Sequence, residues 1–140
     1  MDRLSSAWLA LRLGIGLTAS LAGLDKFFNL LAEWDRYVAP IATQMLPVPV
    51  GTFMGIVGVV EMIVGAAILT RWTRFGAYVA CVWLAGVSLN LALAGFFDVA
   101  VRDAVMSVAA FTLARLQEVR DQTSTYAFER IPHEPQRVPA

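Results

Sequence analysis

A glutamate, Glu61, lies at the centre of the apolar stretch GVVEMIVG, residues 58–65. An ionised carboxylate is costly in an apolar environment, so such a side chain usually faces the interior of a helix bundle or a cavity and pairs with another group. Two cations, Arg12 and Lys26, lie within a second apolar stretch. These residue types predict a buried charge pair, which either only holds helices together or handles a ligand or a proton.

A second group of polar side chains lies toward the ends of the apolar stretches. It combines charges with the hydrogen-bonding amide of an asparagine and has the indole of Trp83 nearby; its members are Asp25, Lys26, Asn90, Arg102 and Asp103. A helix-lined pocket for a small molecule typically has this composition, because a few polar groups orient a mostly apolar ligand. We therefore predict ligand binding by Lys26, Glu61, Trp83, Asn90 and Asp103, whereas no residue can be assigned a catalytic role.

Metal and thiol chemistry have few candidate residues in this chain. Cys81 is the single cysteine and His133 the single histidine, so the chain by itself cannot form an internal disulfide, a CxxC pair or a multi-histidine metal site. We predict no metal site, and we interpret Cys81 as a small buried apolar side chain. Any redox centre would have to come from outside the chain.

The elements that position these residues are long apolar segments. Of the 140 residues, 58% are hydrophobic and only 16% are charged, which is unusually apolar for a soluble domain. Four segments approach the roughly 20 residues that a membrane-spanning helix needs, namely residues 7–31, 50–69, 75–97 and 99–116. We predict an all-α membrane protein with a four-transmembrane-helix bundle. A soluble all-α core is the alternative, but too few polar residues remain to cover its outside.

The first segment also resembles a secretory leader, because Arg3 precedes an apolar run that contains small residues. Arg12 interrupts that run, however, and hydrophobic residues continue past the possible cleavage site as far as Leu31. We therefore expect the first helix to remain in the protein. The equal numbers of basic and acidic residues, eleven of each, give no overall positive charge and disfavour nucleic-acid binding.

The distribution of arginine predicts the orientation of the four helices. Both termini and the turn with Arg71 and Arg74 lie on one side, so we predict that this side is cytoplasmic. The loop 32–49 then faces outward, and its Trp34, Tyr37 and prolines indicate an interfacial segment or a short lid. The tail 117–140 is predicted to be cytoplasmic, helical for a turn or two beyond Arg120 and then largely disordered, with His133 in solvent.

Helical periodicity aligns the buried charges with small residues. Arg12, Gly16, Ala19, Gly23 and Lys26 share one face of the first helix, and Gly51, Met54, Gly58, Glu61, Gly65 and Ile68 share one face of the second. Two such faces are expected to pack closely against each other in a membrane. With a rise of about 1.5 Å per residue from the predicted helix ends, Arg12 and Glu61 lie at similar depths in the membrane. Arg12 is therefore the first choice of partner for Glu61, while the Lys26 side chain extends toward the outer surface. In the outer group we predict that Asp103 faces Lys26, that Arg102 faces Asp25, and that Asp98 caps the last helix.

The stretches LRLGIGLTASLAGLDKFF, GIVGVVEMIVGAAIL and LNLALAGFFDVAVRDAVMSVAAFTLARL together resemble the DoxX-like membrane proteins. Arg12, Gly23, Lys26 and Glu61 carry the resemblance, which covers most of the chain from Leu9 to Leu116. It implies a small multi-pass protein of the bacterial inner membrane. It also implies a link with membrane oxidoreductase complexes and with sulfur or thiosulfate metabolism that uses quinone as the acceptor.

Two functional hypotheses follow. The first is an accessory subunit of a membrane redox complex that binds a quinone or another small molecule; if the chain is catalytic, it is a quinone-linked oxidoreductase. The second is a non-enzymatic membrane scaffold or small-molecule carrier whose buried charge pairs are structural. The expected partners are the lipid bilayer and either other subunits of a complex or further copies of the chain. We favour an accessory subunit over a complete enzyme, because the chain lacks a cysteine pair and a histidine cluster.

Overall fold

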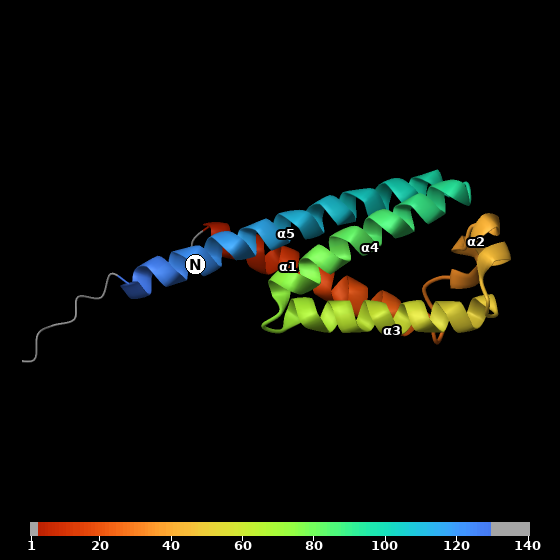
Figure 1. The fold of residues 1–140 in the computed structure, drawn as a ribbon, viewed down its shortest axis with the longest axis horizontal. Coiled ribbons are helices and arrows are strands. Elements are labelled where there is room, and N and C mark those ends of the chain that lie inside the picture. The colour runs from red at the N-terminus through yellow and green to blue at the C-terminus, as the bar shows by residue number, and fades with distance from the viewer. Residues whose placement is uncertain (1–2, 130–140) are drawn as a thin grey trace, which may run out of the picture.

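The computed structural model describes residues 3–129, and this part of the chain contains helices and no strands (Figure 1). The helices are α1 (Arg3–Asp25), the 3-10 helix η1 (Trp34–Tyr37), α2 (Pro40–Met45), α3 (Val50–Leu69), α4 (Thr73–Leu93) and α5 (Phe97–Glu129). The predicted all-α architecture is confirmed for these residues.

The four long helices form two pairs. α1 packs mainly on α3 and α4 mainly on α5, while α3–α4 and α1–α5 contacts join the pairs. The start of α1, the α3–α4 turn and the last part of α5 lie together at one end, which we call the tail end (Figure 1). Residues 26–49 and the α4–α5 turn lie at the opposite end, which we call the loop end. Consecutive long helices run in opposite directions, because short turns join α3 to α4 and α4 to α5.

The helix ends differ from the predicted limits for local reasons. α1 stops at Asp25 instead of Leu31, because the Asp25 carboxylate accepts hydrogen bonds from the backbone N–H groups of Leu30 and Leu31 and folds the chain back. α4 stops at Leu93, because Gly95 adopts a left-handed φ of 85°. The N–H groups of Gly95 and Phe96 then donate to carbonyls in the last turn of α4, which terminates the helix.

The fourth long helix does not end at Leu116 as predicted. α5 has 33 residues and is therefore about 50 Å long. Beyond Leu116 the helix is held to α1, because Trp8 Nε1 donates to Gln117 at 2.8 Å and Arg120 donates to Ser5 at 3.0 Å. The helical extension predicted for a turn or two beyond Arg120 is present, and the helix reaches Glu129. Residues 130–140, with His133, lie outside the described part of the chain.

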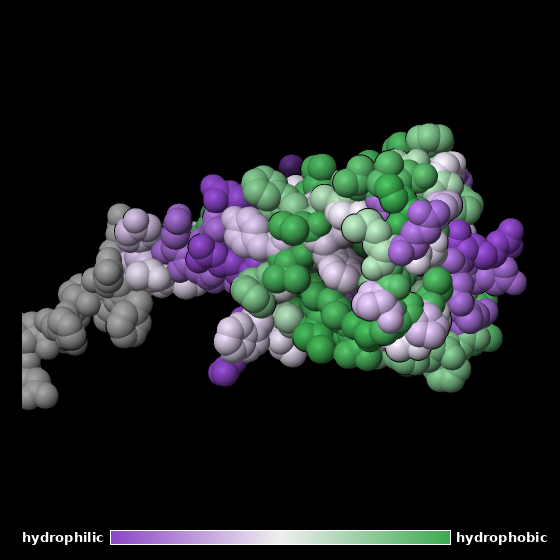
Figure 2. Space-filling view, turned by 45° about the vertical axis from the view of Figure 1, so that its right-hand side comes forward, coloured by the Kyte–Doolittle hydropathy of each residue, from purple (hydrophilic) through white to green (hydrophobic). Residues whose placement is uncertain are grey.

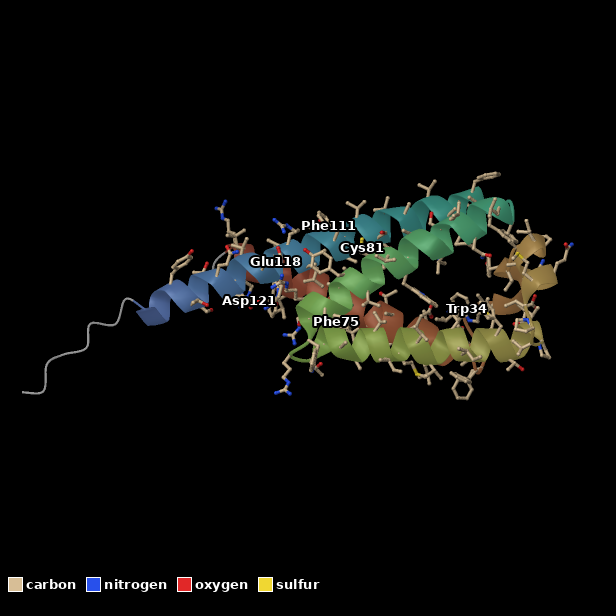
Figure 3. All side chains as sticks on the ribbon, viewed as in Figure 1. Trp34, Phe75, Cys81, Phe111, Glu118 and Asp121 are labelled. Atoms are coloured by element: carbon tan, nitrogen blue, oxygen red, sulfur yellow. The ribbon has the colours of Figure 1, made fainter. Side chains whose placement is uncertain are left out.

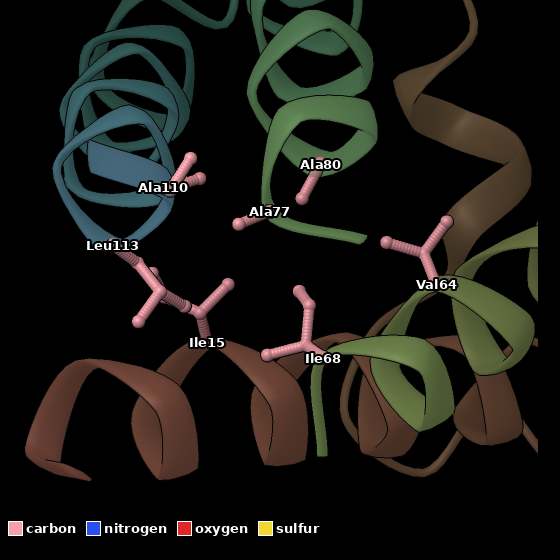
Figure 4. Close-up of a cluster of buried hydrophobic side chains, with 8 residues drawn as sticks. Ile15, Val64, Ile68, Ala77, Ala80, Ala110 and Leu113 are labelled. Atoms are coloured by element: carbon pink, nitrogen blue, oxygen red, sulfur yellow. The ribbon is translucent and has the colours of Figure 1, made fainter. Parts of the chain in front are cut away.

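The distribution of apolar side chains is that of a membrane protein. Three helices, α1, α3 and α4, are long and apolar enough to cross a membrane. The interior holds few large side chains, since only Ile68 and Leu113 are both large and fully buried among the described residues, and alanines make up much of the core (Figure 4). Large apolar side chains instead point outward along the helices, including Leu13, Leu17, Leu21, Ile56, Ile63, Val82, Leu89, Val101, Val105 and Val108. Figure 2 shows hydrophobic residues over much of one face, between hydrophilic groups toward its two ends.

Glycines bring α1 and α3 into backbone contact. A Cβ atom added to Gly23 would lie 2.5 Å from the carbonyl oxygen of Gly58, and one added to Gly58 would lie 2.6 Å from that of Gly23. One added to Gly65 would lie 2.7 Å from the carbonyl oxygen of Gly16. The predicted packing of the two small-residue faces is confirmed, and it sets the register of the antiparallel pair.

Candidate functional site: a buried ion pair at the loop end

Lys26 and Glu61 form the buried ion pair of the bundle. Lys26 Nζ lies 2.6 Å from Glu61 Oε2, and the two side chains are only 4% and 15% exposed. The glycine contact between α1 and α3 creates this pair. A Cβ on Gly58 would lie 3.2 Å from the Lys26 Cβ, and a Cβ on Gly23 would lie 3.0 Å from the Glu61 Cβ. Each charged side chain therefore starts beside a glycine of the opposite helix.

The predicted pairing of Arg12 with Glu61 is wrong. Arg12 donates from Nε to the carbonyl of Ile68 at 2.9 Å and from Nη2 to those of Leu69 and Thr70 at 2.7 and 2.6 Å. α1 begins at Arg3, earlier than predicted, and its first turns extend past the end of α3. Arg12 thus lies level with the last carbonyls of α3, which it caps and whose helix dipole it offsets.

Two indoles enclose the ion pair. Lys26 Nζ lies 3.9 Å from the ring centre of Trp34, a cation–π distance. Trp83 Nε1 lies 3.5 Å from Glu61 Oε1, at the long limit of a hydrogen bond. Both rings belong to an apolar cluster that includes Met54 and Val57 of α3, and Trp34 thereby fills space between α3 and α4 (Figure 3). Trp83 was a predicted site residue; Trp34 was predicted only as a loop aromatic.

Asp103 was predicted to face Lys26. Its side chain is 14% exposed, and its ion-pair partner is Arg102, with Nε to Oδ1 at 3.4 Å. The predicted Asp103–Lys26 pair is not formed in the described residues, because Lys26 pairs with Glu61 instead.

The predicted pairing of Asp25 with Arg102 is wrong, because loop groups already occupy the Asp25 carboxylate. Trp34 Nε1 donates to Asp25 Oδ2 at 2.8 Å, in addition to the two backbone N–H groups that turn the chain. Asp25 is buried. It thus orients the indole of Trp34, the ring that covers Lys26.

Asn90 holds the loop over the end of the bundle. Its Oδ1 accepts from the N–H of Ala39 at 3.0 Å, and its Nδ2 donates to the carbonyl of Tyr37 at 2.7 Å. Tyr37 also packs on Phe96, with ring centres 4.9 Å apart. Val38 and Ala39 are buried as a result. Asn90 was predicted to bind a ligand, but the oxygen and the nitrogen of its amide both bind the loop backbone instead. A hydrogen bond between a side chain and a distant loop backbone produces no periodic pattern in the sequence.

The site consists of the Lys26 ammonium, the Glu61 carboxylate and the indoles of Trp34 and Trp83, beneath a loop that Asn90 holds in place. In the described part of the chain, every buried side-chain nitrogen and oxygen has a hydrogen-bond partner, and no group of histidine, cysteine and acidic residues could hold a metal ion. The Lys26 ammonium has three N–H donors. Glu61 accepts from one of them, and Trp34 contacts the ammonium only through the face of its ring, so donors remain for a ligand. Chemically, the Lys26 ammonium can donate a hydrogen bond to a carbonyl or hydroxyl oxygen.

No protein-family model, curated protein or solved structure matches the chain.

Proposed function

We propose that the chain is a four-span membrane protein of the DoxX-like type that binds the polar head of a hydrophobic small molecule beside the Lys26–Glu61 pair. A quinone is the ligand class that fits best, and an accessory subunit of a bacterial inner-membrane redox complex is the corresponding role. One observation carries this proposal: a lysine with 4% side-chain exposure lies between a carboxylate and an indole face. Intramembrane ionisable groups of this kind commonly mark ligand or proton sites.

The proposed fourth span is the first part of α5. Asp98, Arg102 and Asp103 lie in its first two turns, and without those charges near one end it would resemble the other spans. Exposed Val101, Val105 and Val108 form a lipid-facing row, while Ala110 and Leu113 are buried. The tail end carries most of the arginines, which supports a cytoplasmic tail end under the positive-inside rule; those in the described residues are Arg3, Arg12, Arg71, Arg74, Arg115 and Arg120.

The proposed binding mode uses groups already in place. The Lys26 ammonium donates to a quinone carbonyl oxygen, and a quinone ring can pack against the Trp34 and Trp83 indoles. The isoprenoid tail would run along the apolar outer faces of the helices.

The scaffold alternative has its own support. All buried polar side-chain atoms in the described residues are already satisfied, so the ion pair is also complete without a ligand. In that case the charges would fix the register of α1 against α3 and do no more.

Quinone-dependent thermal stability separates the two functions. A ligand that binds only the folded protein must raise its apparent stability through mass action. We expect a short-tailed ubiquinone or menaquinone analogue to raise the melting temperature of the detergent-purified protein, and Trp34→Leu to weaken the quinone affinity about tenfold by removing an aromatic face of the site. The matched control is Trp72→Leu, which removes an exposed indole at the tail end.

The site hypothesis requires that Trp72→Leu keep the wild-type quinone response. If wild type shows no response, or if both variants respond like wild type, the quinone site is wrong and the scaffold function replaces it.

A further inference from the structure

A separate cavity of about 370 Å³ opens at the tail end of the bundle, far from the Lys26–Glu61 pair along α1 and α3. It is formed by α1, the α3–α4 turn and α5, and its lining includes Trp8, Arg12, Arg71, Thr73, Arg120 and Asp121. Asp121 appears on α5 at this end in Figure 3. Nothing in the proposed quinone site uses these residues.

Three arginines give the cavity its charge. In the described part of the chain, five other cations have a carboxylate within 4 Å, but Arg12, Arg71 and Arg120 have none. Arg12 donates only to carbonyls, and Arg120 lies 4.1 Å from the Trp8 ring centre. The acidic Asp121 accepts a hydrogen bond from Gln117 at 2.7 Å. Three guanidinium groups against one carboxylate leave a cavity with a net positive charge.

The start of α4 borders the same cavity. Trp72 precedes the helix without giving it a side-chain cap, and Thr73, the first residue of α4, lines the cavity. The Thr73 hydroxyl donates backward to the carbonyls of Ile68 and Thr70. The first N–H groups of α4 therefore have no side-chain acceptor, and a helix N-terminus in this state favours an anion.

The position of the cavity along the bundle corresponds to the level of the lipid headgroups. Arg120 follows Phe97 by 23 positions along α5, or about 35 Å, which slightly exceeds the roughly 30 Å of a bilayer's hydrocarbon core. With the loop end at one membrane surface, the cavity lies at the level of the headgroups on the other. Trp8 lines it, as aromatic residues do at membrane interfaces.

We propose that this cavity binds the phosphate of an anionic phospholipid on the cytoplasmic side, through Arg71, Arg120 and the N-terminus of α4. The inference rests on the proposed membrane insertion and is independent of the quinone site, so a failed quinone assay leaves it intact. Basic pockets between membrane helices on the cytoplasmic side are suited to such headgroups.

The test compares two arginines that line adjacent cavities. Arg120 lines only the proposed site, whereas Arg74 lines only the neighbouring cavity of Arg71, Trp72 and Phe75. Melting temperatures of the full-length protein in neutral detergent are measured during titration with phosphatidylglycerol, phosphatidylcholine or inorganic phosphate. We expect wild type to respond most strongly to phosphatidylglycerol, Arg120→Gln to weaken that affinity about fivefold, and Arg74→Gln to leave it unchanged.

Arg120→Lys keeps the charge and is expected to retain most of the affinity, which separates lost binding from lost folding. Equal responses to phosphatidylglycerol and phosphatidylcholine would overturn the proposal, as would equal losses in Arg120→Gln and Arg74→Gln. If inorganic phosphate stabilises wild type as strongly as the lipid at the same concentration, the lipid is wrong as the source and the site belongs to a soluble phosphate compound.

Discussion

Lys26→Met is expected to destabilise the protein by about 3 to 5 kcal/mol, the largest effect of any single substitution considered for this chain. The change removes the only cation that contacts Glu61 in the described residues and leaves a carboxylate with 15% side-chain exposure inside the bundle. Methionine preserves the length and apolar character of the lysine stem, so the loss reports the stranded charge and not a cavity. Unfolding in detergent, by heat or by a denaturing surfactant, measures it.

The double variant Lys26→Met with Glu61→Gln should recover much of this loss, because it removes the carboxylate that was left without a partner. The exposed pair of Arg36 and Glu33 provides a control, since Arg36→Met removes a cation whose side chain is 75% exposed. That variant is expected to change stability by less than about 1 kcal/mol. Strictly additive losses in the double variant would mean that Lys26 and Glu61 do not neutralise each other.

Gly23→Ala is expected to cost about 1 to 3 kcal/mol through overpacking. The new methyl group would lie 2.5 Å from the Gly58 carbonyl oxygen and 2.9 Å from the Met62 nitrogen, both of which are backbone atoms. α1 and α3 would have to move apart, and the ion pair that grows from the same contact would lengthen. Thermal unfolding of the purified variant measures the cost.

The control is Gly14→Ala in the same helix, where an added Cβ meets nothing within 4 Å. Alanine is the better helix former, so this variant is expected to equal or slightly exceed the wild-type stability. Equal stability of the two variants would show that α1 and α3 do not approach at Gly23, which would also remove the geometric basis of the Lys26–Glu61 pair.

The sequence predicted the packing faces better than the depths of the residues on them. The faces around Gly23 and Gly58 were correct, because the 3.6-residue period depends only on local spacing. Depth depends on where each helix begins and on which residues of two helices touch. The choice of Arg12 as partner for Glu61 assumed a first helix over residues 7–31, whereas α1 spans Arg3–Asp25.

The contacts made by the loop between α1 and α3 could not be predicted from helical periodicity. Asp25 ends α1 by accepting backbone hydrogen bonds, and Asn90 binds the backbone of Tyr37 and Ala39. Both interactions join positions whose separation in the sequence carries no information about contact. Trp34 was therefore expected only at an interface, although its ring covers the Lys26 ammonium. The helical extension beyond Arg120 was predicted, but its contacts with Ser5 and Trp8 were not, since they too join distant positions.

The number of spans depends on whether α5 crosses the membrane. With four spans, the Lys26–Glu61 pair lies inside the bilayer and both termini lie on one side. Gln44→Cys and Thr125→Cys, both at exposed positions, are introduced separately into a Cys81→Ala background and treated in intact cells with a membrane-impermeant maleimide. We expect labelling at position 44 in intact cells and at position 125 only after the membrane is opened. Labelling of position 125 in intact cells together with position 44 would mean that α5 does not cross, and it would contradict the four-span topology.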